Sequence, residues 1–197
     1  MTGSDFRAQP AAEEDRYRFT KDYTTPYVPF WEAHLGVFRG RPDVHFLEVG
    51  SFEGRTALWY LDHLLTDPSS TMTCVDIFED TGYEPRFDHN REVSGHAHRW
   101  TKLKGRSQDI LPTLAGNRYD AVYVDGGHTA ALAYSDAEMC WPMLKPGGVM
   151  SFDDYEWRLH RPVENRPQQG IDRFLHEHRD ELEILHKAYT VMAKRVG

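Results

Sequence analysis

The sequence predicts a single α/β domain built on a doubly wound, mostly parallel sheet of seven strands that ends in an antiparallel C-terminal hairpin. Three observations support this fold class. Short apolar segments of strand length alternate with amphipathic segments of helix length, which is the pattern of a parallel sheet covered on both faces. The chain has 197 residues, the length of one domain with a full-sized core. Two final apolar segments lie close enough together to pair as a hairpin.

The expected strands are short and rich in apolar residues. In chain order they are residues 44–49, 71–76, 100–103, 121–125 and 149–152, followed by the hairpin segments 182–186 and 190–195. The expected helices carry apolar residues three or four positions apart. They cover residues 28–38, 58–65, 87–93, 109–114, 133–144 and 171–178. The segment Lys145-Pro146-Gly147-Gly148 is expected to stop the fifth helix before the fifth strand begins.

Charge and composition exclude several classes of partner. The chain carries 23 Lys and Arg against 31 Asp and Glu, a formal net charge of −8. Nucleic-acid binding is not expected, because contacts to phosphates need a basic surface. No apolar run approaches the roughly 20 residues that span a bilayer, so no membrane segment is expected.

The N-terminal segment and the two cysteines indicate how the chain is divided into domains and in which compartment the protein is located. Residues 1–22 are polar and show no periodicity, so we expect a flexible N-terminal arm ahead of a single domain, residues 23–197. The N-terminus lacks the basic and apolar stretches of a signal peptide. Cys74 and Cys140 fall inside expected buried elements, which favours a reducing, cytoplasmic location. A homo-oligomer is compatible with all of these features.

The candidate cofactor site begins where the first strand ends, because ligands of open parallel sheets bind beyond the carboxyl ends of the strands. Two glycines bracket the strand-to-helix turn in residues 48–54, Glu-Val-Gly-Ser-Phe-Glu-Gly. Glycine lets the backbone approach a ligand closely, and the helix start offers free N–H groups. Phe52 stands where dinucleotide-binding loops carry a glycine, which disfavours a nicotinamide cofactor. The candidate ligands are Glu48, Gly50, Ser51 and Gly54; the alternative is a purely structural turn.

Two further strand ends extend this site. Asp76 ends the second strand, where a carboxylate can accept two hydrogen bonds from a ribose diol. A lone aspartate at such a position is more often a helix cap or a turn residue. Ser107 and Gln108 follow the third strand, where polar groups can reach an adenine edge; the alternative is a structural role.

The sharpest signal comes from the fourth and fifth strands, which are neighbours in a doubly wound sheet. Asp125 and His128 follow the fourth strand, and Asp153 and Asp154 follow the fifth. Three uncompensated carboxylates in one crevice repel one another and favour a bound cation. Hard oxygen ligands without paired Cys or His favour Mg²⁺. The alternative is that Asp153 and Asp154 cap the next turn while His128 caps a helix.

Several segments resemble a known family of enzymes. They are EVGSFEGRTAL, VDIFED, GRSQDILPTL, YVDGGHTAALAYSDAEMCWPMLKPGGVMSFDDY and ELEILHKAYTVMAKR. They resemble small class I methyltransferases that use S-adenosylmethionine (SAM) and have a Rossmann-like sheet. In particular they are similar, over roughly residues 44–196, to the metal-dependent macrocin and mycinamicin sugar O-methyltransferases. The chain is much shorter than those macrolide enzymes, so the resemblance does not extend to their substrate or assembly.

The resemblance implies a role for each residue of the acidic cluster. Asp125, Asp153 and Asp154 would bind Mg²⁺, and His128 would be the general base, with Asp125 beside it in the catalytic centre. Imidazole suits this role because it titrates near neutral pH. The expected reaction is methylation of a small-molecule hydroxyl, on a natural product or a sugar-like acceptor.

The acceptor is expected to contact the loop that follows the acidic pair. Its candidate residues are Tyr155, Trp157, His160 and Arg161, together with Tyr27 near the first helix. Trp31 on that helix is better explained by core packing. Two alternatives remain: a metal-independent methyltransferase acting on oxygen or nitrogen, and, less favoured, a metal-dependent hydrolase that binds no SAM.

Overall fold

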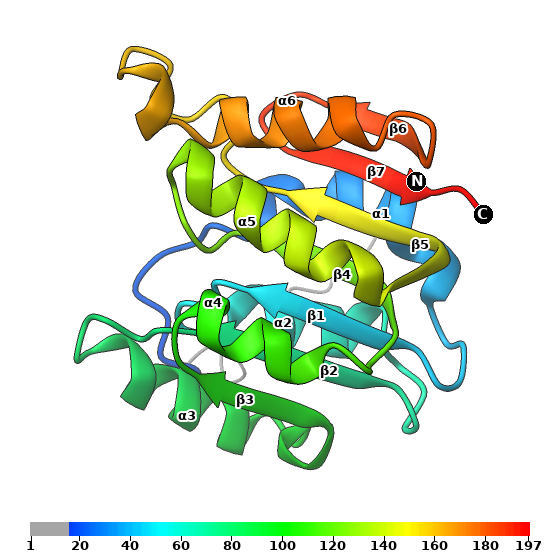
Figure 1. Cartoon of the computed structure of the whole chain (residues 1–197). Coiled ribbons are helices and arrows are strands. Elements are labelled where there is room, and N and C mark those ends of the chain that lie inside the picture. The colour runs from blue at the N-terminus through cyan, green and yellow to red at the C-terminus, as the bar shows by residue number, and fades with distance from the viewer. Residues whose placement is uncertain (1–15) are drawn as a thin grey trace, which may run out of the picture.

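The computed structural model describes residues 16–197, which form a central sheet flanked by helices (Figure 1). The strands of this sheet are β1 (His45–Val49), β2 (Thr71–Asp76), β3 (Trp100–Lys104), β4 (Tyr119–Val124), β5 (Leu144–Phe152), β6 (Leu182–Lys187) and β7 (Val191–Arg195). The α-helices in this part of the chain are α1 (Val28–Leu35), α2 (Arg55–His63), α3 (Tyr83–Val93), α4 (Ser107–Ile110), α5 (Ala130–Cys140) and α6 (Pro167–Glu177).

The sheet has seven strands in the order β3-β2-β1-β4-β5-β7-β6. Strands β1 to β5 pair in parallel, and β7 lies antiparallel between β5 and β6. The predicted fold class, including the antiparallel C-terminal hairpin, is therefore confirmed. The strand order reverses between β1 and β4, so the crevice at their carboxyl ends is where a ligand is expected.

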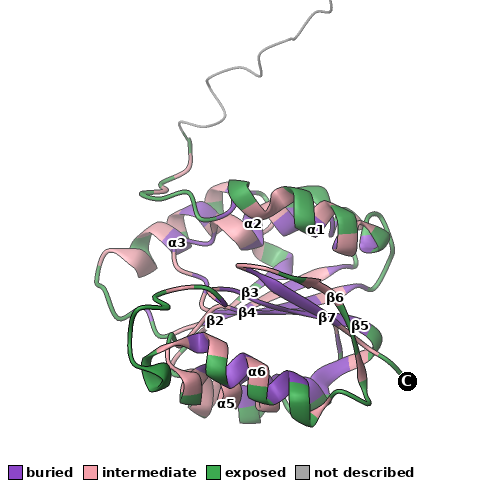
Figure 2. Cartoon of the chain, turned by 90° about the horizontal axis from the view of Figure 1, so that it is seen from above, coloured by how far each residue is buried: buried purple, intermediate pink, exposed green. Residues whose placement is uncertain are grey.

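Each face of the sheet carries its own hydrophobic core. Helices α1, α2 and α3 cover one face, and α5 and α6 cover the other (Figure 2). The first core contains Phe46, Tyr60 and Trp100, all buried. The second contains Phe152 and Phe174, also buried. The strands are apolar because both of their faces are covered.

The expectation that residues 145–148 separate a helix from the fifth strand is wrong. Helix α5 already ends at Cys140, and β5 begins at Leu144 and runs through this segment. The pairing of β5 with β4 shifts register here, because Tyr119 pairs with Leu144 while Ala121 pairs with Val149. A bulge thus absorbs the Pro-Gly-Gly sequence within the strand.

The prediction of a flexible arm over residues 1–22 is wrong for residues 16–22, which hydrogen-bond to buried side chains of the domain. Thr20 donates to the Glu53 carboxylate twice, from its backbone N to Oε2 at 2.6 Å and from Oγ1 to Oε1 at 2.8 Å. Arg18 N donates to Asn90 Oδ1 at 2.6 Å. Glu53 and Asn90 are fully buried. Residues 16–22 are therefore held against Glu53 of the glycine loop and against α3, while residues 1–15 lie outside the described residues.

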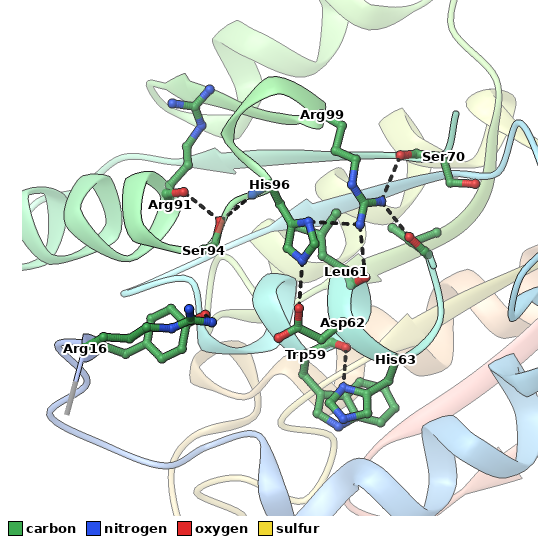
Figure 3. Close-up of polar contacts among 12 residues, drawn as sticks. Arg16, Trp59, Leu61, Asp62, His63, Ser70, Arg91, Ser94, His96 and Arg99 are labelled. Atoms are coloured by element: carbon green, nitrogen blue, oxygen red, sulfur yellow. Dashed lines mark hydrogen bonds and ion pairs between the residues drawn. The ribbon is translucent and has the colours of Figure 1, made fainter. Parts of the chain in front are cut away.

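The end of α2, the helix that follows the glycine loop, is capped by a buried arginine (Figure 3). The Arg99 guanidinium donates to the carbonyl oxygens of Leu65 at 2.5 Å, Ser70 at 3.1 Å and Leu61 at 3.2 Å. His96 Nδ1 lies 3.1 Å from the same guanidinium, and its Nε2 lies 2.7 Å from Asp62 Oδ1. These contacts satisfy carbonyl groups that a helix end leaves free, and they fix α2 beside the sheet.

The two cysteines lie inside buried elements, as the sequence predicts. Cys74 and Cys140 are buried and free, and burial raises the pKa of both thiols. Such thiols stay protonated and unreactive. Within residues 16–197, no helix is long and apolar enough to cross a membrane.

Candidate active site

The glycine loop and the end of β4 meet in direct backbone contact. Gly50 has a φ of +88°, and a Cβ at this position would lie 2.0 Å from the carbonyl oxygen of Asp125. Only glycine fits, because any side chain would push the two strand ends apart. Asp125 N also donates to Val49 O at 2.8 Å. The loop predicted to bind a cofactor is therefore fixed against the first residue of the acidic cluster.

Asp76 shapes the glycine loop from the next strand. Its Oδ2 accepts from the backbone N–H groups of Ser51 at 2.7 Å and Phe52 at 2.8 Å, and its Oδ1 accepts from Phe78 N at 2.6 Å. Phe52 and Phe78 have φ values of 48° and 49°, which non-glycine residues rarely adopt. A carboxylate has about four acceptor sites, so Asp76 keeps capacity for a ribose hydroxyl while it orders the loop.

Glu48 lies beneath the loop rather than on its open side. Its side chain is buried, and Cys74 Sγ lies 3.3 Å from Oε2. Burial raises the pKa of Glu48 to about 7. Glu48 therefore lies within the sheet, directly before the loop, and its role as a cofactor ligand stays a prediction. Gly54, at φ +81°, also serves packing, since a Cβ there would lie 2.9 Å from the Trp100 ring.

Ser107 and Gln108 form the first turn of α4, at the same edge of the sheet. Gln108 Nε2 donates to Oδ1 of Asp136 on α5 at 3.2 Å. Both residues are half-buried, so their polar atoms lie near the surface beside the strand ends. Their position is consistent with the predicted adenine contact.

The acidic cluster is the most charged part of this edge. One ligand atom from each of Asp125, His128 and Asp154 lies within 4.8 Å of the others. His128 Nε2 is 2.9 Å from Asp154 Oδ2. Burial and then the charges of Asp153 and Asp154 raise the pKa of Asp125 well above its usual value. This set of donors with unbalanced negative charge fits a divalent cation.

Asp153 lines the same cavity but lies outside that tight group of three. Its Oδ1 accepts from Thr190 Oγ1 at 3.2 Å, and the Tyr123 hydroxyl also bonds to it. Burial, followed by the Asp154 charge, raises the pKa of Asp153 to about 6. Of the three predicted metal ligands, Asp125 and Asp154 thus lie in one tight group with His128, and Asp153 lines the cavity beside them.

Tyr189 is a site residue that the sequence analysis missed. Its hydroxyl donates to Asp154 Oδ1 at 2.7 Å, and its ring stacks on Tyr27 with centroids 6.0 Å apart. It lies in the turn between β6 and β7. Because β7 pairs antiparallel with β5, with Val191 opposite Phe152, that turn must fall beside the end of β5. The predicted hairpin could have located Tyr189, had its position in the sheet been known.

The predicted acceptor residues separate into two groups. Trp157 faces the site, with its ring centroid 4.8 Å from that of His128. His160 and Arg161 are exposed on the same loop. Tyr155 is instead part of the hydrophobic core, and its hydroxyl donates to Asp172 Oδ1 at 2.8 Å.

The two aromatic residues expected near the first helix also differ from one another. Trp31 is fully buried in the other core, which confirms the packing explanation. Tyr27 is close to the carboxylates: burial and then the charges of Asp153 and Asp154 raise its pKa. Tyr27 and Tyr189 therefore lie together beside the carboxylates of the acidic cluster.

A seven-stranded sheet of this topology, with a glycine loop after β1 and an acidic residue after β2, defines a class I, SAM-dependent methyltransferase fold. Residues 47–155 match the model of a family described as a methyltransferase domain. This match covers more than half of the chain, so the chain belongs to that methyltransferase family. The predicted class is therefore confirmed.

Solved structures of low sequence identity share the fold. The O-methyltransferase TomG from Streptomyces achromogenes, which is involved in tomaymycin synthesis, is 20% identical with a TM-score of 0.66, over 86% of this chain and 80% of its own. An O-methyltransferase from Bacillus cereus in complex with S-adenosylhomocysteine (SAH) is 15% identical with a TM-score of 0.71, over 93% and 86%. MycE of the mycinamycin pathway, in complex with Mg and SAH, is 15% identical with a TM-score of 0.66, over 92% and 52%. No curated protein sequence matches the chain.

Proposed function

We propose that the protein transfers the methyl group of SAM to a hydroxyl oxygen of a small-molecule acceptor, natural-product or sugar-like, with the help of Mg²⁺. One observation carries the proposal. The group of Asp125, His128 and Asp154 lies against the glycine loop, through the contact of Gly50 with the Asp125 carbonyl. A methyl donor on the loop and an acceptor at the cluster would therefore be neighbours. TomG is an O-methyltransferase and MycE was solved with bound Mg, which points the same way.

The cofactor would lie along the carboxyl ends of β1 to β4. Its amino-acid end would meet the glycine loop, its ribose would meet the free acceptor site of Asp76, and its adenine would meet Ser107 and Gln108. Most of the acceleration in such a transfer comes from holding the two reactants in line.

Asp125 and Asp154 are the residues that would hold the cation, with Asp153 beside them. Bound Mg²⁺ supplies charge that lowers the pKa of an acceptor hydroxyl and orients it. Tyr189 holds one oxygen of Asp154 in place, and His128 contacts the other. With Asp154 holding the cation, His128 Nε2 would be free to accept the proton of the acceptor hydroxyl. The hydroxyl oxygen then bonds to the methyl carbon as the carbon–sulfur bond breaks, which leaves SAH.

Trp157 and the Tyr27–Tyr189 pair border this position. Their rings exclude water from the acceptor side and offer faces that attract the sulfonium charge. Trp157, His160 and Arg161 are the residues of the exposed loop that we assign to acceptor binding; Tyr155 supports that loop from the core.

Calorimetric titration of SAH, with and without MgCl₂, tests the cofactor assignment first. We expect micromolar binding that is lost in Asp76→Ala and kept in Asp180→Asn, since Asp180 is exposed. Absence of SAH binding to the wild type would overturn the methyl-transfer proposal and favour the hydrolase.

Methyl-transfer assays on a panel of vicinal diols and amines, each with Mg²⁺ or EDTA, test the acceptor atom and the metal requirement. We expect methylated oxygen as the product and loss of turnover in EDTA. Turnover that persists in EDTA would show a metal-independent enzyme, and methylated nitrogen would overturn the assignment of the acceptor atom.

A further inference from the structure

Asp136 is a buried carboxylate that the proposed chemistry does not use. It lies on α5 and is 0% exposed. Its Oδ1 accepts the hydrogen bond from Gln108 Nε2 at 3.2 Å, whereas its Oδ2 has no hydrogen-bond partner. A buried carboxylate with an unpaired oxygen costs stability. Packing alone therefore does not account for an aspartate at this position.

The surroundings of Asp136 place it between two segments of the cofactor edge. A Cβ at Gly126 would lie 3.0 Å from Asp136 Oδ2, so the carboxylate sits directly under the turn that follows β4. Burial raises the pKa of Asp136, and the Ser107 hydroxyl and the Gly127 amide oppose that rise. Asp136 thus contacts both the turn that carries the acidic cluster and the start of α4.

Asp136 determines which end of the Gln108 amide points inward. Oδ1 can only accept a hydrogen bond, so it selects the NH₂ group of the amide. This holds in both protonation states of Asp136, because Oδ2 is the oxygen left to carry a proton. With Nε2 fixed on the buried side, the carbonyl oxygen Oε1 is the polar atom that Gln108 has left for a ligand. No residue within the described chain donates to Oε1, and Gln108 is half-buried.

We propose that Asp136 is a positioning residue that makes Gln108 present Oε1 to the 6-amino group of the cofactor's adenine, so that the site selects a 6-aminopurine over a 6-oxopurine. The inference rests on the proposed function, which places adenine at Ser107 and Gln108. An amino group donates to Oε1, whereas an oxo group would face it as a second acceptor. A site built to receive a hydrogen-bond donor rejects an analogue that lacks it.

The test compares two ligands, SAH and S-inosylhomocysteine, in which a 6-oxo group replaces the 6-amino group. Their dissociation constants are measured by calorimetry for the wild type, Asp136→Leu, Gln108→Leu and Asp109→Asn. We expect the wild type to prefer SAH by about tenfold or more, the effect of one lost hydrogen bond that leaves an acceptor unpaired. Asp136→Leu should largely abolish the preference, because without the acceptor Oδ1 nothing on the buried side selects Nε2, and the Gln108 amide can turn either end towards the ligand.

The other two variants are matched controls. Gln108→Leu removes the amide and should abolish the preference as well. Asp109→Asn removes the same charge from the next residue, which is exposed, and should keep the wild-type preference. The ratio of the two dissociation constants is the decisive quantity, because a general loosening of the fold weakens both ligands alike. Thermal unfolding verifies that each variant is folded, and Asp136→Ala replaces Asp136→Leu if the latter is not.

The outcomes separate the inference from the proposed function. If the wild type binds SAH and Asp136→Leu retains its full preference, the positioning role of Asp136 is overturned. If the wild type binds the two ligands equally, the selectivity itself is overturned. If the wild type fails to bind SAH, the proposed function is overturned, and the inference with it.

Discussion

The hydroxyl of Tyr189 donates to Oδ1 of Asp154 at 2.7 Å, while Nε2 of His128 lies 2.9 Å from Oδ2 of the same carboxylate. Asp154 thus joins the turn after β4 to the turn between β6 and β7. Its φ of 61° is one that few non-glycine residues adopt. Backbone strain of this kind is concentrated at functional sites, where the surrounding contacts hold it. The orientation of this carboxylate is therefore set by the fold before a ligand arrives.

The first prediction concerns that support. Tyr189→Phe should lower Mg²⁺ affinity about 10- to 100-fold, because residues that orient a metal ligand contribute effects of this size. Mg²⁺ titration by calorimetry in the presence of SAH measures it. Tyr134→Phe is the matched control, since the Tyr134 hydroxyl also donates to a carboxylate, Glu177 Oε2 at 2.6 Å, on an exposed surface. Equal Mg²⁺ affinity in the two variants would remove Tyr189 from this role.

A second prediction separates the three carboxylates. Asp125→Asn should eliminate the heat of Mg²⁺ binding, because Asp125 belongs to the tight group with His128 and Asp154. Asp153→Asn should weaken Mg²⁺ binding less, since Asp153 is already bonded to Thr190 and Tyr123. The same calorimetric titration measures both. Loss of binding in both variants would instead support the ligand set expected from the sequence, with Asp153 as a full ligand.

The third prediction concerns the proton. His128→Ala should lower kcat about 10²- to 10⁴-fold, the usual contribution of a positioned general base. SAH affinity should not change, because the imidazole contacts Asp154 and Trp157 rather than the glycine loop. His176→Ala, at an exposed position on α6, is the control. Turnover of His128→Ala close to that of the wild type would show that another group takes the proton.

The sequence located most of the fold because its strands are short, apolar and covered on both faces, which leaves a clear pattern. Residues 71–76 are the strand both as predicted and as observed. The Pro-Gly-Gly segment at 146–148 was misjudged, because pairing with β4 absorbs it as a bulge that local propensity does not reveal. The same holds for residues 16–22, which are fixed by distant buried partners, Glu53 and Asn90.

The residues of the candidate site that directly follow strands could be predicted from the sequence, and those brought in by remote elements could not. Asp125, His128, Asp153 and Asp154 are visible in the sequence because each follows a strand. Tyr189 was not, since only the antiparallel pairing of β7 with β5 brings its turn to Asp154. The position of Tyr155 in the core likewise depends on α6, which supplies Asp172. Residues that act through contacts between remote elements need the tertiary structure to be recognised.

The last prediction uses the buried Glu48, whose pKa burial raises to about 7 from the ordinary value of 4.5. The folded protein therefore binds this proton more tightly than the unfolded chain does. The stabilisation is fully present below about pH 4.5 and is lost as the pH rises through about 7. Glu48→Gln cannot titrate, so between pH 5 and pH 8 the wild type should lose stability relative to the variant, by on the order of 2–3 kcal/mol. Urea unfolding at the two pH values measures the difference, with the exposed Glu92→Gln as control. Parallel pH dependence of the wild type and Glu48→Gln would mean that Glu48 stays ionised beneath the loop, with a partner that compensates its charge.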